Sequence, residues 1–219
     1  VALARGGRDV LIIDQSHKEQ GAAAALGLTP RHDVMDVLAG RCTLDALILT
    51  GPDNVQVLPI GGGFSRLGRL SERDQEWLAK SFTQLQCGVD VVLVDMEEAT
   101  DPDALPLGLA ASEIMVVLPP GNTAITQAYT LVKRLSQNFG KRQFRLLLNR
   151  IESPEQAQAV ATNFAQTAER YLSVSVDYLG YIPLDERLNR ANRLRTSVVD
   201  AFPVAQSTSQ FRKLADGLL

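Results

Sequence analysis

Six short apolar segments alternate with more polar ones along the chain. Several are continuously apolar and rich in Val, Ile and Leu, which is typical of strands covered on both faces of a parallel sheet. The last segment alternates apolar and polar residues, so we expect it near an edge. The predicted strands are Asp9–Asp14, Val55–Ile60, Val89–Asp95, Glu113–Pro119, Gln143–Asn149 and Val176–Ile182.

Helical patterns occupy segments between these strands. Ser71–Asp74 resembles a capping box, apolar residues recur at helical spacing over Ile125–Leu135, and Ser153–Pro154 has the form of a helix start. Alternation of strands and helices predicts an α/β fold, a mostly parallel sheet with helices on both faces. Because no linker or internal repeat interrupts the pattern, we expect one domain over residues 1–219.

Composition narrows the class of protein. The chain has 219 residues, of which 45% are hydrophobic, enough for one sizeable core. Its formal net charge of -3 shows no basic excess of the kind that indicates nucleic-acid binding. Cys42 and Cys87 form no CxxC pair, and we interpret them as reduced thiols of a cytoplasmic protein. No apolar run approaches the ~20 residues that a membrane helix needs.

Two predicted strands end in an aspartate, Asp14 and Asp95. In parallel α/β sheets, ligands bind beyond the carboxyl ends of the strands, where carboxylates can hold magnesium or its waters beside phosphates. The alternative is that aspartate is common wherever a strand turns into a loop, and spacing alone leaves both interpretations open. Gly61–Gly63 follows another strand, but no Lys-Ser/Thr pair comes after it, so we interpret it as a tight turn.

Motifs along the whole chain resemble the MinD/ParA-type deviant Walker ATPases, which have a P-loop NTPase fold of the SIMIBI class. The stretch Tyr171–Asp185 (YLSVSVDYLGYIPLD) is similar to the flagellar-number regulator group FlhG in particular. The resemblance implies an ATP-switched homodimer that regulates flagellar number or placement. The other matching segments are Arg8–Asp14, Leu26–Leu28, Asp33–Gly40, Val89–Asp95, Val116–Lys133 and Leu146–Arg150.

The resemblance also implies ATP and Mg²⁺ as cofactors and assigns roles to matching positions. Asp14 matches the first aspartate of the switch segment, and Asp95 matches the Walker B aspartate that binds a magnesium-bound water. Asn149 matches the asparagine that contacts adenine, while Pro183 and Asp185 match the loop that closes over the base. No catalytic residue is assigned. The candidate cofactor-binding residues are Asp14, Asp95, Asn149, Arg150, Pro183 and Asp185, with Asp95 as the metal contact.

The sequence departs from the family pattern at its start. Val1–Gly7 reads as the last turn of a helix with a glycine stop. We therefore expect that the first strand and the phosphate-binding loop lie upstream of Val1; a short native start is the alternative. In the family that strand lies inside the sheet beside the Walker B strand, so without it we expect an interrupted sheet with exposed edges.

Further departures bear on hydrolysis. Ser16 stands where the family has a second aspartate that assists hydrolysis, and Lys18 and Gln20 replace small glycines. After Asp95, Glu97 and Glu98 replace a small turn. A general-base role for either glutamate is conceivable, but we favour a solvated acidic loop. ATPase activity is thus implied by the family and opposed by these residues, which makes a non-hydrolysing MinD-like scaffold the alternative function. A cellulose-synthesis or pilus-localising relative is another.

Two surface segments concern partners. An arginine cluster from Arg187 to Arg195 suits a solvated face or a protein contact better than DNA, so nucleic acid is not an expected partner. Ser209–Leu219 has helical apolar spacing, and docking on the core is favoured over membrane binding, with peripheral contact at the inner membrane kept as the alternative. The expected partners are a second copy of the chain and flagellar or other polar-assembly proteins.

Overall fold

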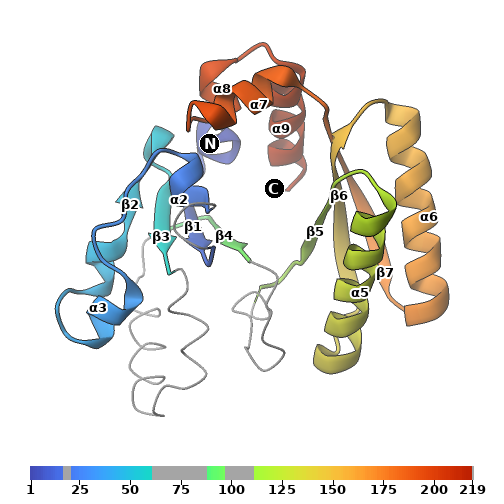
Figure 1. Cartoon of the computed structure of the whole chain (residues 1–219), viewed down its shortest axis with the longest axis horizontal. Coiled ribbons are helices and arrows are strands. Elements are labelled where there is room, and N and C mark those ends of the chain that lie inside the picture. The colour runs from blue at the N-terminus through green and yellow to red at the C-terminus, as the bar shows by residue number, and fades with distance from the viewer. Residues whose placement is uncertain (17–20, 61–87, 97–110, 219) are drawn as a thin grey trace. The chain divides into compact units, whose positions relative to one another are not determined.

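The computed structural model describes residues 1–16, 21–60, 88–96 and 111–218 (Figure 1). Contacts divide the chain into two compact units, each built from two stretches of sequence. The first unit comprises Val1–Gly108 and Ala191–Ala201, and the second comprises Leu109–Arg190 and Phe202–Leu219. The expectation of a single domain stays a prediction, and the two units are described separately.

A four-stranded sheet forms the centre of the first unit. Its order is β2-β3-β1-β4, with β1 parallel to both β3 and β4, and with β2 antiparallel to β3. The strands are β1 (Val10–Asp14), β2 (Leu49–Thr50), β3 (Gln56–Pro59) and β4 (Val91–Asp95). Because β1 lies between two parallel neighbours, its continuous run of apolar residues is buried, as the sequence pattern predicts.

Short helices surround this sheet. Helix α3 is fixed by a capping box in which the Asp33 carboxylate accepts from backbone N–H groups and Asp36 accepts from the Asp33 N–H. Val37 of α3 packs against Leu11 and Leu58 from the sheet. The helices of this unit are α1 (Ala2–Arg5), α2 (Ala22–Ala25), α3 (Val34–Leu38), the 3₁₀ turns η1 (Leu44–Leu47) and η2 (Pro52–Asn54), and α8 (Val198–Ala201).

Arg5 ties distant parts of the first unit together. Its Nε donates to Asp53 at 2.9 Å, and its Nη1 donates to the carbonyl oxygen of Val199 at 2.9 Å. The guanidinium also forms an ion pair with Asp200. These contacts explain why a segment from near the end of the sequence belongs to the same unit as α1.

The second unit contains a three-stranded parallel sheet of order β5-β6-β7. Its strands are β5 (Met115–Leu118), β6 (Gln143–Ile151) and β7 (Ser175–Pro183). The expected edge position of the last strand is confirmed. The long helices are α5 (Asn122–Phe139) and α6 (Pro154–Leu172), followed by α7 (Glu186–Arg193) and α9 (Gln206–Gly217). The end of α7, from Ala191 on, belongs to the first unit.

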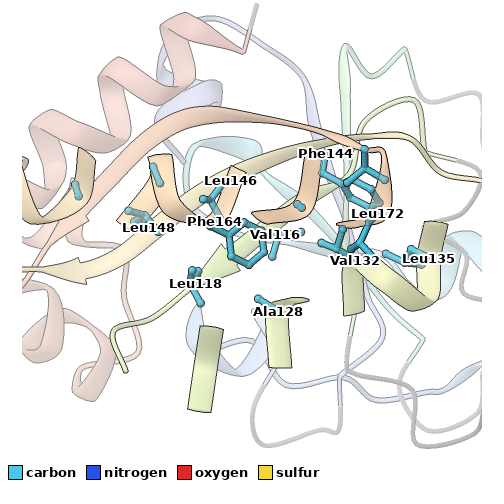
Figure 2. Packing of buried hydrophobic residues seen from close by; sticks show 14 of the residues in the cluster. Val116, Leu118, Ala128, Val132, Leu135, Phe144, Leu146, Leu148, Phe164 and Leu172 are labelled. Atoms are coloured by element: carbon cyan, nitrogen blue, oxygen red, sulfur yellow. The ribbon is translucent and has the colours of Figure 1, made fainter. Parts of the chain in front are cut away.

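Helices cover both faces of this second sheet. Figure 2 shows Leu146 of β6 beside Phe164 of α6, and Phe144 of β6 beside Leu172 at the end of α6, in one cluster on one face. Leu147 of β6 points to the other face because side chains alternate along a strand, and it pairs with Gly180 of β7. Gly180 has φ +138°, and the position of an added Cβ lies 3.5 Å from a methyl of Leu214 on α9. The expected docking of the C-terminal helix on the core is therefore confirmed.

The predicted fold class is confirmed, since all six expected strands are present in mostly parallel sheets with helices. The described strands form two sheets, in agreement with the expected interruption of the sheet. β4 and β5 each end a sheet and expose apolar side chains, with Val92 48% and Val117 51% exposed. The predicted capping box Ser71–Asp74 and the turn Gly61–Gly63 lie outside the described residues.

Candidate functional site

Asp14 and Asp95 lie side by side at the carboxyl ends of β1 and β4, at one end of the first sheet. They are paired in the parallel register of β1 and β4, so both strands end at the same level. The backbone N–H of Gln15 donates to the carbonyl oxygen of Asp95 at 3.1 Å, and that of Ile60 donates to the carbonyl oxygen of Asp14 at 2.8 Å. The expected placement of Asp14 and Asp95 on one edge is confirmed. Asn149, expected on the same edge, lies on β6 of the second sheet, and its placement beside the aspartates stays a prediction.

The Asp14 carboxylate is buried and organises the turn that follows β1. Only 3% of this residue is exposed. Its Oδ1 accepts from the N–H of Ser16 at 3.0 Å, and its Oδ2 accepts from the N–H of Ala23 in α2 at 3.0 Å. A Cβ added to Gly21 would collide with both carboxylate oxygens. Asp14 therefore acts as an anchor for the chain entering α2, a role that its position at a strand end does not reveal.

Asp95 is exposed, in contrast to Asp14. The hydroxyl of Ser16 lies 3.4 Å from Asp95 Oδ2 and donates to it. Since the backbone N–H of Ser16 is itself held by Asp14, the three residues form a series of hydrogen bonds from the buried to the exposed carboxylate. Of these three residues, Asp14 is buried, Ser16 is half-buried and Asp95 is exposed to solvent.

These residues fit an indirect contact with magnesium. The part of the chain that the structure describes contains no group of three or more His, Cys, Asp or Glu side chains able to hold a metal ion. Asp14 does not fit as a direct ligand, because both of its oxygens accept backbone hydrogen bonds in a buried position. Asp95 is exposed and anionic, and Mg²⁺ usually keeps several of its waters, so Asp95 fits a contact with a magnesium-bound water.

In the second unit, Asn149, Arg150 and Pro183 lie together at the carboxyl ends of β6 and β7. Asn149 pairs with Ile182, and Pro183 pairs with Ile151. Arg150 is the extra residue of a β-bulge between these pairs, with φ +60°. A bulge re-aims a side chain out of the regular alternation. The structure thus gathers three of the expected cofactor-binding residues at the carboxyl ends of two neighbouring strands.

Asp185 joins the starts of two helices. Its Oδ1 accepts from the N–H of Arg187 in α7 at 2.8 Å. Its Oδ2 accepts from the N–H of Ser207 at 3.1 Å and from the Ser207 hydroxyl at 2.8 Å, at the start of α9. Burial alone would raise the pKa of Asp185, but the hydrogen bonds from Ser207 and Arg187 together lower it. Ser207 was missed by sequence reasoning, because it lies 22 residues away.

Two further features concern partners: the arginine cluster and the question of a membrane-spanning helix. The Arg190 guanidinium lies 5.7 Å from the centre of the Phe202 ring, so this arginine of the predicted cluster is engaged in packing. Among the described helices, none has the length and apolar character required to cross a membrane. Lys18, Gln20, Glu97 and Glu98, which depart from the family pattern, lie outside the described residues.

Comparison with known proteins identifies the family, although no family model matches the sequence. MinD from Pyrococcus horikoshii, solved with Mg-ADP, superimposes with a TM-score of 0.70 at 22% identity, over 99% of this chain and 86% of that one. MinD from Aquifex aeolicus, in a MinC:MinD complex, gives 0.70 at 20%, over 99% and 85%. The antiactivator FleN of Pseudomonas aeruginosa is 31% identical over 215 residues, 98% of this chain and 77% of FleN. The chain therefore belongs to the MinD/ParA-type ATPase family, in the group of FleN (FlhG).

Proposed function

We propose that this chain is the switch core of a regulator of flagellar number or placement, controlled by Mg-ATP. The observation that carries the proposal is the 31% identity with the antiactivator FleN across 98% of the chain. The paired Asp14 and Asp95 support it, because they place an anchored turn and an exposed carboxylate at the sheet edge where such folds bind ligands.

Each candidate residue has a distinct part in this proposal. Asp95 contacts a magnesium-bound water, and Asp14 holds the turn beside it. Asn149 contacts adenine, Arg150 binds the nucleotide beside it, and the Pro183–Asp185 loop closes over the base. Magnesium, when bound, neutralises charge on the phosphates. The residues of this chain supply position and shape, and none is proposed as a general base.

The proposed switch works by assembly. ATP bridges two copies of the protein, and the homodimer binds flagellar or other polar-assembly proteins in the cytoplasm, including at the inner-membrane surface. MinD of Aquifex aeolicus forms a complex with a protein partner, MinC, which supports a partner-binding role in this fold. Ser16 favours a second candidate, a non-hydrolysing scaffold that holds its partner without turnover, because a hydroxyl is neutral at the position of the assisting aspartate.

Deleting the gene in the organism that encodes it, and counting flagella by electron microscopy, tests the flagellar proposal. We expect an altered number or position of flagella, restored by the wild-type full-length protein and by the control Asp45→Asn, which changes an exposed carboxylate away from the strand ends. Asp95→Asn should fail to restore it. Unchanged flagella together with altered cellulose or pili would contradict the flagellar proposal and favour the function of a cellulose-synthesis or pilus-localising relative.

Binding of Mg-ATP by the full-length protein is tested separately by titration calorimetry. A second measurement, of size by light scattering with and without nucleotide, reports the homodimer. We expect binding and dimerisation to require the same nucleotide. A dimer that forms equally well without nucleotide, together with no detectable Mg-ATP binding, would favour the scaffold and contradict the nucleotide switch.

A further inference from the structure

We propose that Ser16 is a positioning residue for Asp95, and that it keeps this carboxylate in place when no metal is present. The inference rests on the proposed nucleotide function for its consequence, and on the contact between the Ser16 hydroxyl and Asp95 Oδ2 at 3.4 Å for its geometry. Ser16 touches Asp95 and no part of the nucleotide is assigned to it, so it acts through Asp95.

Backbone hydrogen bonds fix the position of Ser16. Its N–H donates to the buried Asp14 carboxylate at 3.0 Å, and the next residue back, Gln15, donates its N–H to the Asp95 carbonyl oxygen at 3.1 Å. Asp14 is in turn held by the N–H of Ala23 at 3.0 Å. Because the backbone leading to the hydroxyl is tied to β1 and β4, Ser16 meets Asp95 with little conformational freedom left to lose.

A hydroxyl suits this position in a way that a carboxylate does not. Ser16 can donate to Asp95, whereas an ionised aspartate only accepts, so two carboxylates at this spacing would repel each other without a cation between them. With serine, the pair is satisfied in the metal-free protein. The edge is therefore preorganised before magnesium arrives, and its geometry depends less on the metal than that of a site with a second acid.

The contact between Ser16 and Asp95 bears on what the site does with a bound nucleotide. It favours holding Mg-ATP over hydrolysing it. Ser16 orients the carboxylate that contacts the metal-bound water and adds no charge to repel the phosphates, and it supplies no carboxylate to assist hydrolysis. The ligand class is a magnesium nucleoside triphosphate, and the specific contribution of Ser16 is to the metal-dependent part of its affinity.

The contact itself is tested without any nucleotide, in the full-length protein. A double-mutant cycle uses Ser16→Ala, Asp95→Ala and the double variant, with unfolding by urea followed by circular dichroism. In the wild-type background Ser16→Ala should change the unfolding equilibrium constant about two- to tenfold, the usual range for one hydrogen bond. In the Asp95→Ala background the same change should have almost no effect. Equal effects in both backgrounds would overturn the proposal.

The consequence for ligand binding is tested by calorimetry with ATP in the presence of Mg²⁺ and in the presence of EDTA. Ser16→Ala should weaken Mg-ATP binding by about two- to tenfold and leave metal-free ATP binding unchanged. Ser16→Thr keeps the hydroxyl and should restore the wild-type value. Ser175→Ala, which removes an exposed hydroxyl on β7, is the matched control.

The two measurements separate two kinds of failure. If the wild-type protein binds no Mg-ATP, the proposed function fails, and the cycle still decides whether Ser16 holds Asp95. If Mg-ATP binds but Ser16→Ala binds it as tightly as the wild type, the positioning role is wrong and the proposed function stands. Equal weakening with and without Mg²⁺ would also contradict a metal-dependent role.

Discussion

Asp14 and Asp95 occupy paired positions in neighbouring parallel strands, yet their carboxylates do different things. Asp14 is 3% exposed and accepts two backbone hydrogen bonds, whereas Asp95 is exposed and accepts from a side chain. One strand end therefore anchors the fold and the other is available to solvent. Substitutions at these two positions should separate stability from binding.

Asp14→Asn should destabilise the protein by about 1–3 kcal/mol, because the amide retains one acceptor oxygen and turns an NH₂ group toward a buried N–H. Asp95→Asn should cost much less free energy of unfolding, since this residue is exposed and the amide oxygen can still accept from the Ser16 hydroxyl. Urea unfolding of both variants at neutral pH measures the difference. Equal destabilisation would contradict the anchoring role of Asp14.

Gly21→Ala should cost stability of about 1–3 kcal/mol, the usual range for overpacking, because the new methyl group collides with the Asp14 carboxylate. Gly88→Ala is the matched control, since nothing lies within 4 Å of a Cβ added there. Thermal unfolding of the two variants measures the contrast. A neutral Gly21→Ala would show that the turn after β1 can move away from Asp14.

The Asp185 hydrogen bonds should make stability depend on pH. The pKa of Asp185 is lowered in the folded protein, so the unfolded state takes up a proton first as the pH falls. The stabilisation is therefore complete above the ordinary carboxyl pKa of about 4 and is lost as the pH drops through the folded value. Asp185→Asn should lower the urea midpoint at pH 7, and its difference from wild type should shrink toward pH 3.

Asp177→Asn is the control for this pH experiment, because it removes another carboxyl from the second unit at an exposed position on β7. Ser207→Ala should reproduce part of the Asp185→Asn effect, since it removes one of the two hydrogen bonds from that residue. A pH-independent difference between Asp185→Asn and wild type would contradict the argument.

The apolar edges of β4 and β5 should bind a hydrophobic dye in the 219-residue chain. Val92 and Val117 are 48% and 51% exposed on strands that end their sheets, and such surfaces are prone to association. Lysine at either position should reduce both dye fluorescence and light scattering. Lysine in place of Gln158, a polar α6 residue, controls for the added charge. An equal loss of fluorescence in all variants would show that the dye binds at a surface other than β4 and β5.

The 219-residue chain should bind ATP no more tightly than about millimolar and should show no ATPase activity. Its sequence contains no Gly-x-x-x-x-Gly-Lys-Ser/Thr loop, and each missing charge-assisted phosphate contact removes roughly 1.5–3 kcal/mol of binding free energy. Fusing a phosphate-binding loop to the N-terminus should raise binding more than hydrolysis, because Ser16 remains. Calorimetry and phosphate release measure both. Micromolar affinity of the short chain, or fast turnover of the extended one, would refute this prediction.

Sequence patterns predicted the strands because burial on both faces demands long apolar runs, and β1 and β6 carry them. Ser153 likewise predicted the start of α6, where its hydroxyl accepts from the N–H of Gln156. β2 was not predicted because two residues are too few to show any period. The division of strands into two sheets was expected only through the family resemblance, because strand order depends on contacts between segments distant in sequence and leaves no trace in the apolar pattern.

For the site, the sequence located strand ends but not what each side chain does there. Asp14 and Asp95 look alike in the sequence, and only the folded chain shows that Ala23 and Gly21 close over one of them. Asp185 was predicted to face the base, and its hydrogen bonds to Ser207 depend on a helix 22 residues later. Such partners carry no local signal, because serine at a helix start has several uses.

The Arg5 ion pair with Asp200 has a consequence for synthesis on the ribosome. The two residues are 195 positions apart, so nearly the whole chain must be translated before they can meet. The first unit needs residues 191–201 to complete its contacts, although most of its sequence emerges first. During elongation, at about 5–20 residues per second, the nascent first unit lacks this closing segment for several seconds.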